Sequence, residues 1–319
     1  MICILGGGGC FALNLARYLD AGVDCLGIGR SKRPAAFMLA PSDYAFTPLH
    51  MVCEQPRLFA MLDDMQPNII VNYAAQGEGA ASFGEHADWF YATNTLMLVQ
   101  LVEFLRTRPW LKRFVQISTS ELYGSVTEPA KEEAPIRPSS RYAVSKAAFD
   151  MDLEIAHRIH GFPMNIIRPS NCYTPGQQLH RIIPKALLCA EKGEKLPLQG
   201  GGRARKSYLH ADDLSRAVMC VLDVGEIGET YNCGPRYPIA IREVVQVCAE
   251  AAGIGFDELV EEASDRVGQD GTYWLNSSKL GALGWFPSID LEEGVQSVLE
   301  WIRAYPELKT MDTRFVLRP

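Results

Sequence analysis

The chain has 319 residues, of which 47% are hydrophobic and 22% are charged, and its formal net charge is −7. This size and hydrophobic content predict one large α/β unit, or two closely packed lobes, with an extensive core. The mildly acidic balance argues against sequence-independent binding to nucleic acid. No apolar run reaches the roughly 18 residues that cross a bilayer, so no membrane partner is expected.

The cysteines, the histidines and the start of the chain bear on the compartment and on metal binding. None of the nine cysteines forms a CxxC pair, and several lie inside apolar runs, as is typical of reduced thiols in a cytosolic protein. The chain begins with a strand-like segment, so we predict no signal peptide and a cytoplasmic location. The six histidines show no metal-binding spacing, and no metal is expected.

Alternating strands and helices are predicted along the first half of the chain. Short apolar runs predict strands, and apolar residues at helical spacing predict helices. In chain order the elements are a strand at 2–5, a helix at 11–19, a strand at 23–28, a helix at 58–65, a strand at 68–73, a helix at 93–105, a strand at 113–118, a helix at 139–160 and a strand at 164–168. This rhythm predicts a doubly wound parallel sheet with helices on both faces.

The character of the sequence changes after about residue 170, where proline, glycine and basic residues are interleaved. We expect residues 1–170 to form the main domain and residues 171–319 to form mainly a smaller C-terminal α/β lobe. Later segments are expected to return to the main domain, because no sharp linker is visible.

Glycines fill the turn between the first predicted strand and the first predicted helix. The spacing Gly6-x-x-Gly9-x-x-Ala12 follows the strand and opens the helix. Glycine permits a tight turn and a close approach of the backbone to a pyrophosphate, at which the helix N-terminus points its free N–H groups. The pattern predicts a dinucleotide site at Gly6, Gly9, Cys10 and Phe11, although glycine clusters also mark ordinary turns.

The end of the second predicted strand indicates which dinucleotide is bound. An acidic residue that accepts the ribose 2′-hydroxyl of NAD is expected there, and Gly29 stands in its place. Arg30, Ser31, Lys32 and Arg33 follow, and such cations pair with a 2′-phosphate. We therefore predict NADP in preference to NAD, bound in part by Arg30, Ser31 and Arg33. The alternative is a solvated basic loop.

A tyrosine and a lysine lie four residues apart near the start of the predicted helix at 139–160. At this spacing Tyr142 and Lys146 share one face of the helix. A lysine cation beside the phenol lowers the pKa of the phenol, which makes Tyr142 a usable base near neutral pH. Taken alone, the YxxxK spacing occurs by chance in many helices and more often marks a surface contact.

A second polar stretch, Ser118-Thr-Ser-Glu-Leu-Tyr-Gly124, follows a predicted strand. Open α/β sheets bind ligands beyond the carboxyl ends of their strands, so catalytic groups are favoured here. Glu121 offers a carboxylate for proton transfer, and Thr119 and Ser120 offer hydroxyls. The alternative for Glu121 is an exposed carboxylate in the first turn of a helix, where the helix dipole favours it.

Together these motifs resemble the extended short-chain dehydrogenase/reductase family, in the branch that acts on nucleotide sugars. The resemblance covers nearly the whole chain, and the ordered set is more specific than any one motif. Beyond the stretches above it includes Asn72-Tyr-Ala-Ala-Gln76, Asn94, Arg168-Pro-Ser-Asn-Cys-Tyr173, Ser207-Tyr-Leu-His-Ala-Asp-Asp213 and Asp265-Arg-Val-Gly-Gln-Asp270. Within the family, Thr119-Ser120-Glu121 is most similar to the GDP-mannose 4,6-dehydratases, which use NADP.

The resemblance implies a Rossmann domain that binds NADP over residues 1–170 and a nucleotide-sugar-binding lobe over residues 171–319. It also implies a homodimer, because family members commonly pair through two helices that include the one bearing Tyr142. It assigns catalysis to Thr119, Ser120, Glu121, Tyr142 and Lys146, further cofactor contacts to Ala74, Ala75, Gln76 and Asn94, and substrate contacts to Gln76, Glu78, Asn171, Arg181, Lys206 and Arg266.

The implied reaction is a 4,6-dehydration in carbohydrate biosynthesis. Tyr142 takes the proton of the hydroxyl on sugar carbon 4, whose hydride passes to the nicotinamide. Glu121 removes the proton on carbon 5, the hydroxyl on carbon 6 leaves as water, and the hydride returns to carbon 6. The alternatives are a 4-epimerase or a uronic acid decarboxylase of the same family. A non-catalytic dinucleotide sensor is disfavoured, because it has no use for a phenol tuned by Lys146.

Departures from the family pattern leave the substrate open. An arginine is usual at the position of Lys206, and lysine lacks the planar fork that contacts a phosphate through two N–H groups. We therefore consider Arg205 as its substitute. The loop at 76–79 is unusually rich in glycine and is expected to border the sugar.

Overall fold

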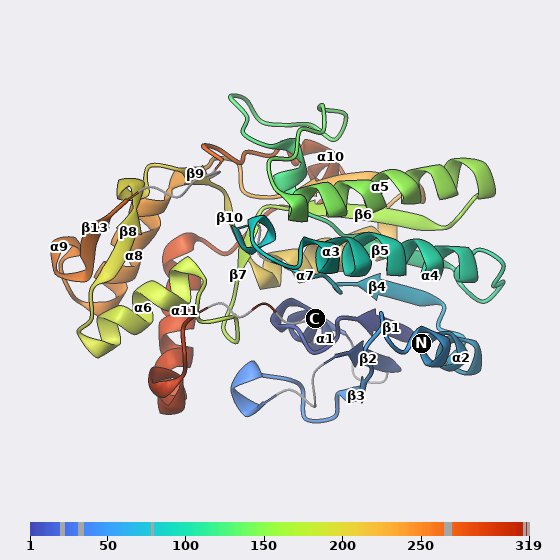
Figure 1. Ribbon diagram of the computed structural model, residues 1–319, viewed down its shortest axis with the longest axis horizontal. Coiled ribbons are helices and arrows are strands. Elements are labelled where there is room, and N and C mark those ends of the chain that lie inside the picture. Colours follow the sequence, from blue (N-terminus) through green and yellow to red (C-terminus); the bar gives the residue numbers. More distant parts are fainter. Residues whose placement is uncertain (20–22, 31–34, 78–79, 265–269, 315–316, 318–319) are drawn as a thin grey trace.

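The structure is a computed structural model that describes residues 1–19, 23–30, 35–77, 80–264, 270–314 and 317. A seven-stranded parallel sheet forms the main domain (Figure 1). Its strands in spatial order are β11 (Thr230–Cys233), β6 (Met164–Pro169), β5 (Arg113–Ile117), β4 (Ile69–Asn72), β1 (Ile2–Leu5), β2 (Cys25–Gly29) and β3 (Ala45–Pro48). The order reverses at β1, so the carboxyl ends of β1 and β4 form a topological switch point. The predicted doubly wound α/β fold is confirmed.

Helices cover both faces of this sheet. α1 (Cys10–Tyr18) and α7 (Ala211–Val224) pack on one face, and α2 (Gln55–Met65), α4 (Met97–Leu105) and α5 (Arg141–His160) pack on the other. Along β1, Ile2 and Ile4 pack on the face covered by α1 and α7, whereas Cys3 and Leu5 pack on the face covered by α2, α4 and α5. Because side chains alternate between the faces of a strand, a strand buried on both sides is apolar throughout.

The 20-residue helix α5 has well-defined ends. The side chain of Ser140 caps its start by accepting a hydrogen bond from the backbone N–H of Ala143 at 3.1 Å. Gly161 ends it in the left-handed conformation, with φ of 65°, which glycine adopts without strain. The helix end that the sequence predicts at residue 160 is therefore confirmed.

The helix predicted at 93–105 is divided in the structure. α3 (Ala87–Tyr91) leads into a π-helical turn, η3 (Ala92–Leu96), which continues into α4. The π turn carries the buried Asn94. Turns of this kind are rare and are frequent at functional sites.

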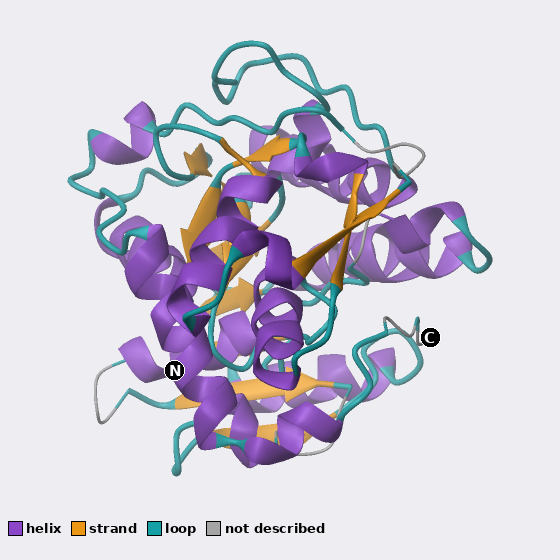
Figure 2. Ribbon diagram, turned by 90° about the vertical axis from the view of Figure 1, so that its left-hand side faces the viewer, coloured by secondary structure: helices purple, strands orange, loops and turns teal. Residues whose placement is uncertain are grey.

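A smaller lobe is formed mainly by the later part of the chain. Figure 2 shows the molecule from the side on which this lobe lies. α6 (Ile182–Lys192), α8 (Ile241–Ala252) and α11 (Leu291–Ala304) enclose a separate apolar core, beside the strand pair β8 (Leu196–Gln199) and β13 (Val260–Ala263). The remaining elements are η1 (Ala36–Met38), η2 (Ala80–Phe83), η4 (Ser120–Tyr123), β7 (Asn171–Tyr173), η5 (Gly200–Gly202), β9 (Arg205–Lys206), β10 (Tyr208–His210), β12 (Ile239–Ala240), α9 (Phe256–Leu259), α10 (Ser278–Gly281) and η6 (Pro306–Thr310).

One early segment crosses from the main domain to the smaller lobe. η1 follows β2 along the chain, and Phe37 and Leu39 pack against the core of the smaller lobe. The backbone carbonyl of Phe37 accepts a hydrogen bond from Trp301 Nε1 of α11 at 2.7 Å. None of the helices described has both the length and the apolar character required to cross a membrane.

Candidate active site

A cleft of about 960 Å³ lies at the carboxyl ends of the central strands, between the main domain and the smaller lobe. Residues that follow β4, β5 and β6 form one wall, and residues of α6 and β8 form the other. Ligands of open α/β sheets bind at this edge. The cleft is therefore the candidate active site.

The glycine turn packs tightly against the segment that follows β4. Gly6 has φ of +74°, and a Cβ at this position would lie 2.6 Å from the backbone nitrogen of Ala74. The backbone N–H of Gly9 donates to the carbonyl of Gly6 at 2.9 Å, and α1 begins at the next residue, Cys10. Phe11 lines the cleft. This turn leaves the N-terminus of α1 directed at the switch point, as the prediction of a diphosphate site requires.

Tyr44 packs against the glycine turn and was not predicted from the sequence. Its hydroxyl donates to the carbonyl of Gly7 at 3.0 Å and lies so close to Gly27 that no Cβ fits there. Burial raises the pKa of Tyr44, so the phenol stays a neutral donor. A glycine inside a strand, as Gly27 is in β2, signals the close approach of another group and was the available clue.

Asn94 positions the predicted cofactor segment through its side chain. Its Oδ1 accepts from the backbone N–H of Gln76 at 2.7 Å, and its Nδ2 donates to the carbonyl of Gln76 at 3.0 Å and to Ser145 Oγ at 2.9 Å. Ser145 Oγ in turn donates to the carbonyl of Tyr142 at 2.7 Å. Asn94 thus ties the segment that contains Ala74, Ala75 and Gln76 to helix α5. Ser145 was not predicted from the sequence.

The five predicted catalytic residues, Thr119, Ser120, Glu121, Tyr142 and Lys146, all line the cleft. Lys146 is 1% exposed, and its Nζ donates to the carbonyl of Ile117 at 2.7 Å. Burial lowers the pKa of Lys146 to about 8, against an opposing effect of the Asp150 carboxylate. An ammonium with this pKa is mostly charged at neutral pH and loses its charge just above it.

Glu121 lies in a short 3₁₀ turn that projects it toward the cleft. Thr119 caps this turn, because its Oγ1 accepts from the backbone N–H of Glu121 at 3.2 Å. The Glu121 side chain is half-buried and lines the cleft. Glu121 therefore lies in the first turn of a helix, as the alternative interpretation expects, and it also lines the cleft.

Three of the predicted substrate contacts, Asn171, Arg181 and Lys206, line the same cleft. Arg181 directly precedes α6, so the N-terminus of α6 also faces this space. Lys206 Nζ donates to the carbonyl of Asp270 at 2.9 Å and lies 3.2 Å from the centroid of the Tyr273 ring. The structure therefore lines the cleft with two cations, Arg181 and Lys206, and with the amide of Asn171.

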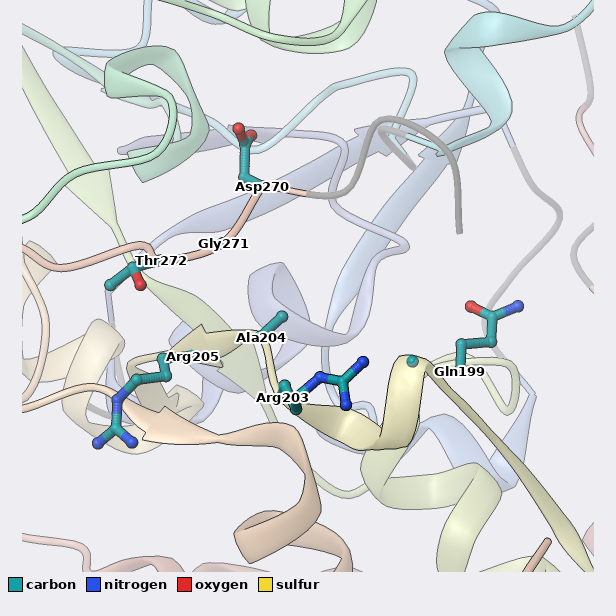
Figure 3. Close-up of a pocket in the computed structure, with 8 residues that line it drawn as sticks. Gln199, Arg203, Ala204, Arg205, Asp270, Gly271 and Thr272 are labelled. Atoms are coloured by element: carbon teal, nitrogen blue, oxygen red, sulfur yellow. The ribbon is translucent and has the colours of Figure 1, made fainter. Parts of the chain in front are cut away.

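Arg205 does not take the place of the usual arginine. Arg205 and Lys206 are consecutive in strand β9, so their side chains point to opposite faces. Arg205 donates to the carbonyl of Pro238 at 2.7 Å and lies 3.8 Å from the carboxylate of Glu243. It lines a neighbouring pocket of about 350 Å³, in which it is directed away from Asp270 (Figure 3). We therefore discard Arg205 as the substitute for that arginine.

Some of the predicted site residues lie outside the described part of the chain. Other residues line the cleft but were not predicted from the sequence. Ser31, Arg33, Glu78 and Arg266 lie outside the described residues, and their contacts stay predictions; Arg30 is described and exposed. The additional residues that line the cleft include Ser139, Gln177, His180, Lys185, Asp270 and Tyr273. Lys185 lies four residues after Arg181, on the same side of α6, and this spacing was the available signal.

Residues 2–234 match the NAD dependent epimerase/dehydratase family. The chain belongs to this family. The predicted membership of the extended short-chain dehydrogenase/reductases is therefore confirmed, as is the prediction of an enzyme that uses a nicotinamide cofactor.

Individual relatives agree with this assignment. A dTDP-glucose 4,6-dehydratase from Streptomyces niveus is 34% identical over 256 residues, covering 79% of this chain and 74% of that protein. The low-salt glycan biosynthesis protein Agl12 from Haloferax volcanii is 30% identical over 305 residues, covering 94% of this chain and 97% of that protein. The structure of DesIV, a dTDP-glucose 4,6-dehydratase from Streptomyces venezuelae with NAD bound, is 26% identical, with a TM-score of 0.89 and coverage of 96% and 98%. These relatives do not single out the GDP-mannose dehydratases.

Proposed function

We propose that the protein is a nucleotide-sugar 4,6-dehydratase that forms a 4-keto-6-deoxy sugar nucleotide. The observation that carries this proposal is the convergence of Thr119, Glu121, Tyr142 and Lys146 on one cleft. The family members named dTDP-glucose 4,6-dehydratase support the same reaction. In this proposal residues 1–170 mainly hold the cofactor and residues 171–319 mainly hold the substrate.

The glycine turn fits a nicotinamide dinucleotide. Gly6 leaves no side chain between β1 and Ala74, and the N-terminus of α1 offers N–H groups for the diphosphate. When bound, the cofactor supplies a reversible hydride acceptor. We propose NADP rather than NAD, because Gly29 leaves no carboxylate at the end of β2 and Arg30 follows it.

The cofactor preference is tested by measuring the Kd of NADPH and NADH for the wild type and for Arg30→Ala. We expect tighter binding of NADPH by the wild type and a selective loss of NADPH affinity in the variant. Arg106→Ala, which removes a cation at the far end of α4, is the matched control. The structure of DesIV has NAD bound. Equal or tighter binding of NADH by the wild type would contradict the proposed preference for NADP and favour NAD.

The oxidation step needs a base at the hydroxyl of sugar carbon 4, and Tyr142 is the group for it. The buried ammonium of Lys146 favours the phenolate of Tyr142 by its charge. Thr119 donates its hydroxyl to the same sugar oxygen and steadies it. Hydrogen bonds from Ser145 and the Ser140 cap hold the first turn of α5 in place, so the phenol stays oriented.

The elimination step needs a second base at carbon 5, and Glu121 is the group for it. Once carbon 4 is a ketone, the neighbouring C–H is acidic and a carboxylate is strong enough to remove its proton. The same carboxyl then returns a proton to the departing hydroxyl of carbon 6. Ser120 orients this hydroxyl, because a serine hydroxyl is too weak an acid to donate the proton itself at neutral pH.

The diphosphate of the substrate is placed at the wall formed by the smaller lobe. Arg181 and Lys206 supply cations, and α6 supplies the N–H groups of its first turn. Asn171 lines the same cleft, and its buried Oδ1 has no hydrogen-bond partner among the described residues. This arrangement orients the sugar toward Tyr142 and Glu121.

The reaction is tested with NADP, a panel of GDP-, UDP- and dTDP-sugars, and mass spectrometry of the products. Loss of one water supports the proposal, whereas loss of carbon dioxide or an unchanged mass with altered stereochemistry would replace it. The Thr119-Ser120-Glu121 motif favours a GDP-sugar and the named relatives favour a dTDP-sugar. Both therefore belong in the panel.

The role of Glu121 is tested by Glu121→Gln, with the exposed Glu128→Gln as its control. We expect Glu121→Gln to accumulate reduced cofactor, because oxidation proceeds while elimination stalls. Glu128→Gln should turn over as the wild type does. Loss of the first oxidation in Glu121→Gln would assign this carboxylate an earlier role.

The alternative function is a 4-epimerase or a nucleotide uronic acid decarboxylase of the same family. One observation favours the decarboxylase: Lys185 adds a cation to the cleft, and a uronic acid substrate carries a carboxylate that such a cation would hold. The mass measurement above separates these reactions.

We also propose that the protein is a homodimer that pairs through α5 and the η3–α4 segment. Met151, Ile155 and Ile159 on α5 are 46%, 49% and 64% exposed. An apolar stripe of this kind marks an interaction surface. Light scattering should give the mass of a dimer for the wild type and of a monomer for Ile155→Lys. Val224→Lys, at a similarly exposed apolar residue on α7, should stay dimeric.

A further inference from the structure

A buried carboxylate lies one helical turn beyond Lys146 on α5. Asp150 is fully buried and is not part of the cleft, although Lys146 and Ser118 are. Its Oδ2 accepts from Ser118 Oγ at 2.7 Å and from Arg168 Nε at 3.0 Å. Its Oδ1 has no hydrogen-bond partner among the described residues. Burying an ion costs free energy of desolvation unless its interactions with neighbouring charged groups compensate for that cost.

Arg168, the partner of Asp150 on β6, is itself held in place. It is 2% exposed, and its NH1 group donates to the hydroxyl of Tyr123 at 3.0 Å and to the carbonyl of Glu132 at 3.1 Å. Its NH2 group lies 3.3 Å from the half-exposed carboxylate of Glu154. Among the described residues, the charged groups around Asp150 are therefore Lys146 and Glu154 on α5 and Arg168 on β6. Ser118 after β5 is a neutral donor to Asp150, and Tyr123 in η4 accepts from Arg168.

The spacing on the helix directs the charge of Asp150 at Lys146. Residues i and i+4 of a helix lie on the same face, so Asp150 is the nearest carboxylate to the ammonium along α5. Lys146 is hydrogen-bonded to the carbonyl of Ile117, a neutral acceptor that does not compensate a buried positive charge. The compensation must come from a charged group, and Asp150 is placed to supply it.

We propose that Asp150 is a positioning residue that keeps the Lys146 ammonium charged beside Tyr142. It acts through Lys146 and does not touch the substrate. The catalytic part of this inference rests on the proposed function, in which Tyr142 is the base that Lys146 activates. Burial alone lowers the pKa of Lys146, and the Asp150 carboxylate raises it again.

The test is an NMR titration of the lysine side chains in the full-length protein without substrate. The Lys146 signal is assigned by its loss in Lys146→Arg. We expect its titration midpoint to fall by about one pH unit in Asp150→Asn, which removes the charge and keeps the size. Glu154→Gln, which removes another carboxylate next to Arg168, should leave the midpoint nearly unchanged. Asp150→Glu should restore it.

A second variant covers the case in which Asp150→Asn does not fold. Arg168→Gln combined with Asp150→Asn replaces the buried ion pair by a neutral pair, which proteins often tolerate. The Lys146 midpoint should fall in this double variant as well. An unchanged midpoint in either folded variant overturns the proposal.

Turnover supplies a separate measurement. In Asp150→Asn the alkaline limit of kcat should fall together with the Lys146 midpoint, while KM stays the same. A lower midpoint with an unchanged pH profile would overturn the catalytic role of Asp150. If no nucleotide sugar is turned over by the wild type, the proposed function fails, and the NMR titration still decides whether Asp150 keeps Lys146 charged.

Discussion

Replacing Gly6 by alanine tests the geometry of the glycine turn directly. Gly6 has φ of +74°, and an added Cβ would lie 2.6 Å from the nitrogen and 2.8 Å from the Cα of Ala74. Both contacts are to main-chain atoms of the segment after β4. Neither can be relieved by the rotation of a side chain, so β1, α1 or the Ala74 segment must shift.

The expected loss of stability follows from two contributions. A residue with a Cβ in the left-handed region costs about 1–2 kcal/mol. Forcing a methyl group into a packed site costs about 1–3 kcal/mol more. The free energy of unfolding should therefore fall by about 2–5 kcal/mol, out of a total of about 5–15 kcal/mol that is usual for a globular protein.

Urea denaturation measures this loss, and nicotinamide fluorescence measures cofactor affinity in the same variant. We expect at least a tenfold weaker affinity, because the N-terminus of α1 moves away from the Ala74 segment. Gly8→Ala is the matched control for stability, since its Cβ would lie 3.4 Å from the Phe46 ring, an ordinary contact. If Gly6→Ala is as stable as Gly8→Ala, the turn geometry described above is wrong.

Three further predictions concern stability and pH. The free energy of unfolding should rise between about pH 8 and 10.5, because in this range Lys146 is neutral in the folded protein and charged in the unfolded chain. Lys146→Met should abolish this rise, and an equal rise in the variant would contradict the prediction. Arg168→Met should cost about 3–5 kcal/mol in urea denaturation by leaving a buried carboxylate uncompensated. Breaking the partly exposed pair of Arg108 and Asp63 should cost far less, and a similar loss in both variants would refute the distinction. Tyr44→Phe should lose about 1 kcal/mol through the bond to Gly7, and an unchanged urea midpoint would count against that bond.

The main sheet could be predicted from the sequence because its strands are buried on both faces. The run at 2–5 is apolar throughout, the runs at 68–73 and 113–118 have apolar residues at their centres, and stretches of helical periodicity separate the three. The edge strand β3 was not predicted, since it is partly exposed and ends in Pro48, which breaks the usual strand pattern. β11 was not predicted either, because residues 230–233 join the sheet from far along the chain through packing against β6.

Only part of the candidate site could be predicted from the sequence. Tyr142 and Lys146 could be found because one turn of a helix fixes their relationship, and Thr119 and Glu121 because they follow a strand directly. The spacing of Asp150 four residues after Lys146 is visible in the sequence, but the burial of Asp150 depends on Ser118, 32 residues earlier, and on Arg168, 18 residues later, and could not be predicted. The error over Arg205 came from treating neighbours in sequence as equivalent, whereas a strand sends them to opposite sides.

The crossing of η1 to the smaller lobe has a consequence for how the enzyme handles its cofactor. The hydrogen bond from Trp301 to the carbonyl of Phe37 joins the chain beyond β2, where the proposed site would hold the ribose of the cofactor, to helix α11 of the smaller lobe. Movement of α11 during the exchange of sugars would then be transmitted to η1. In the proposed reaction the hydride is returned in every turnover, so an enzyme that keeps its dinucleotide while sugars come and go loses nothing by this tether.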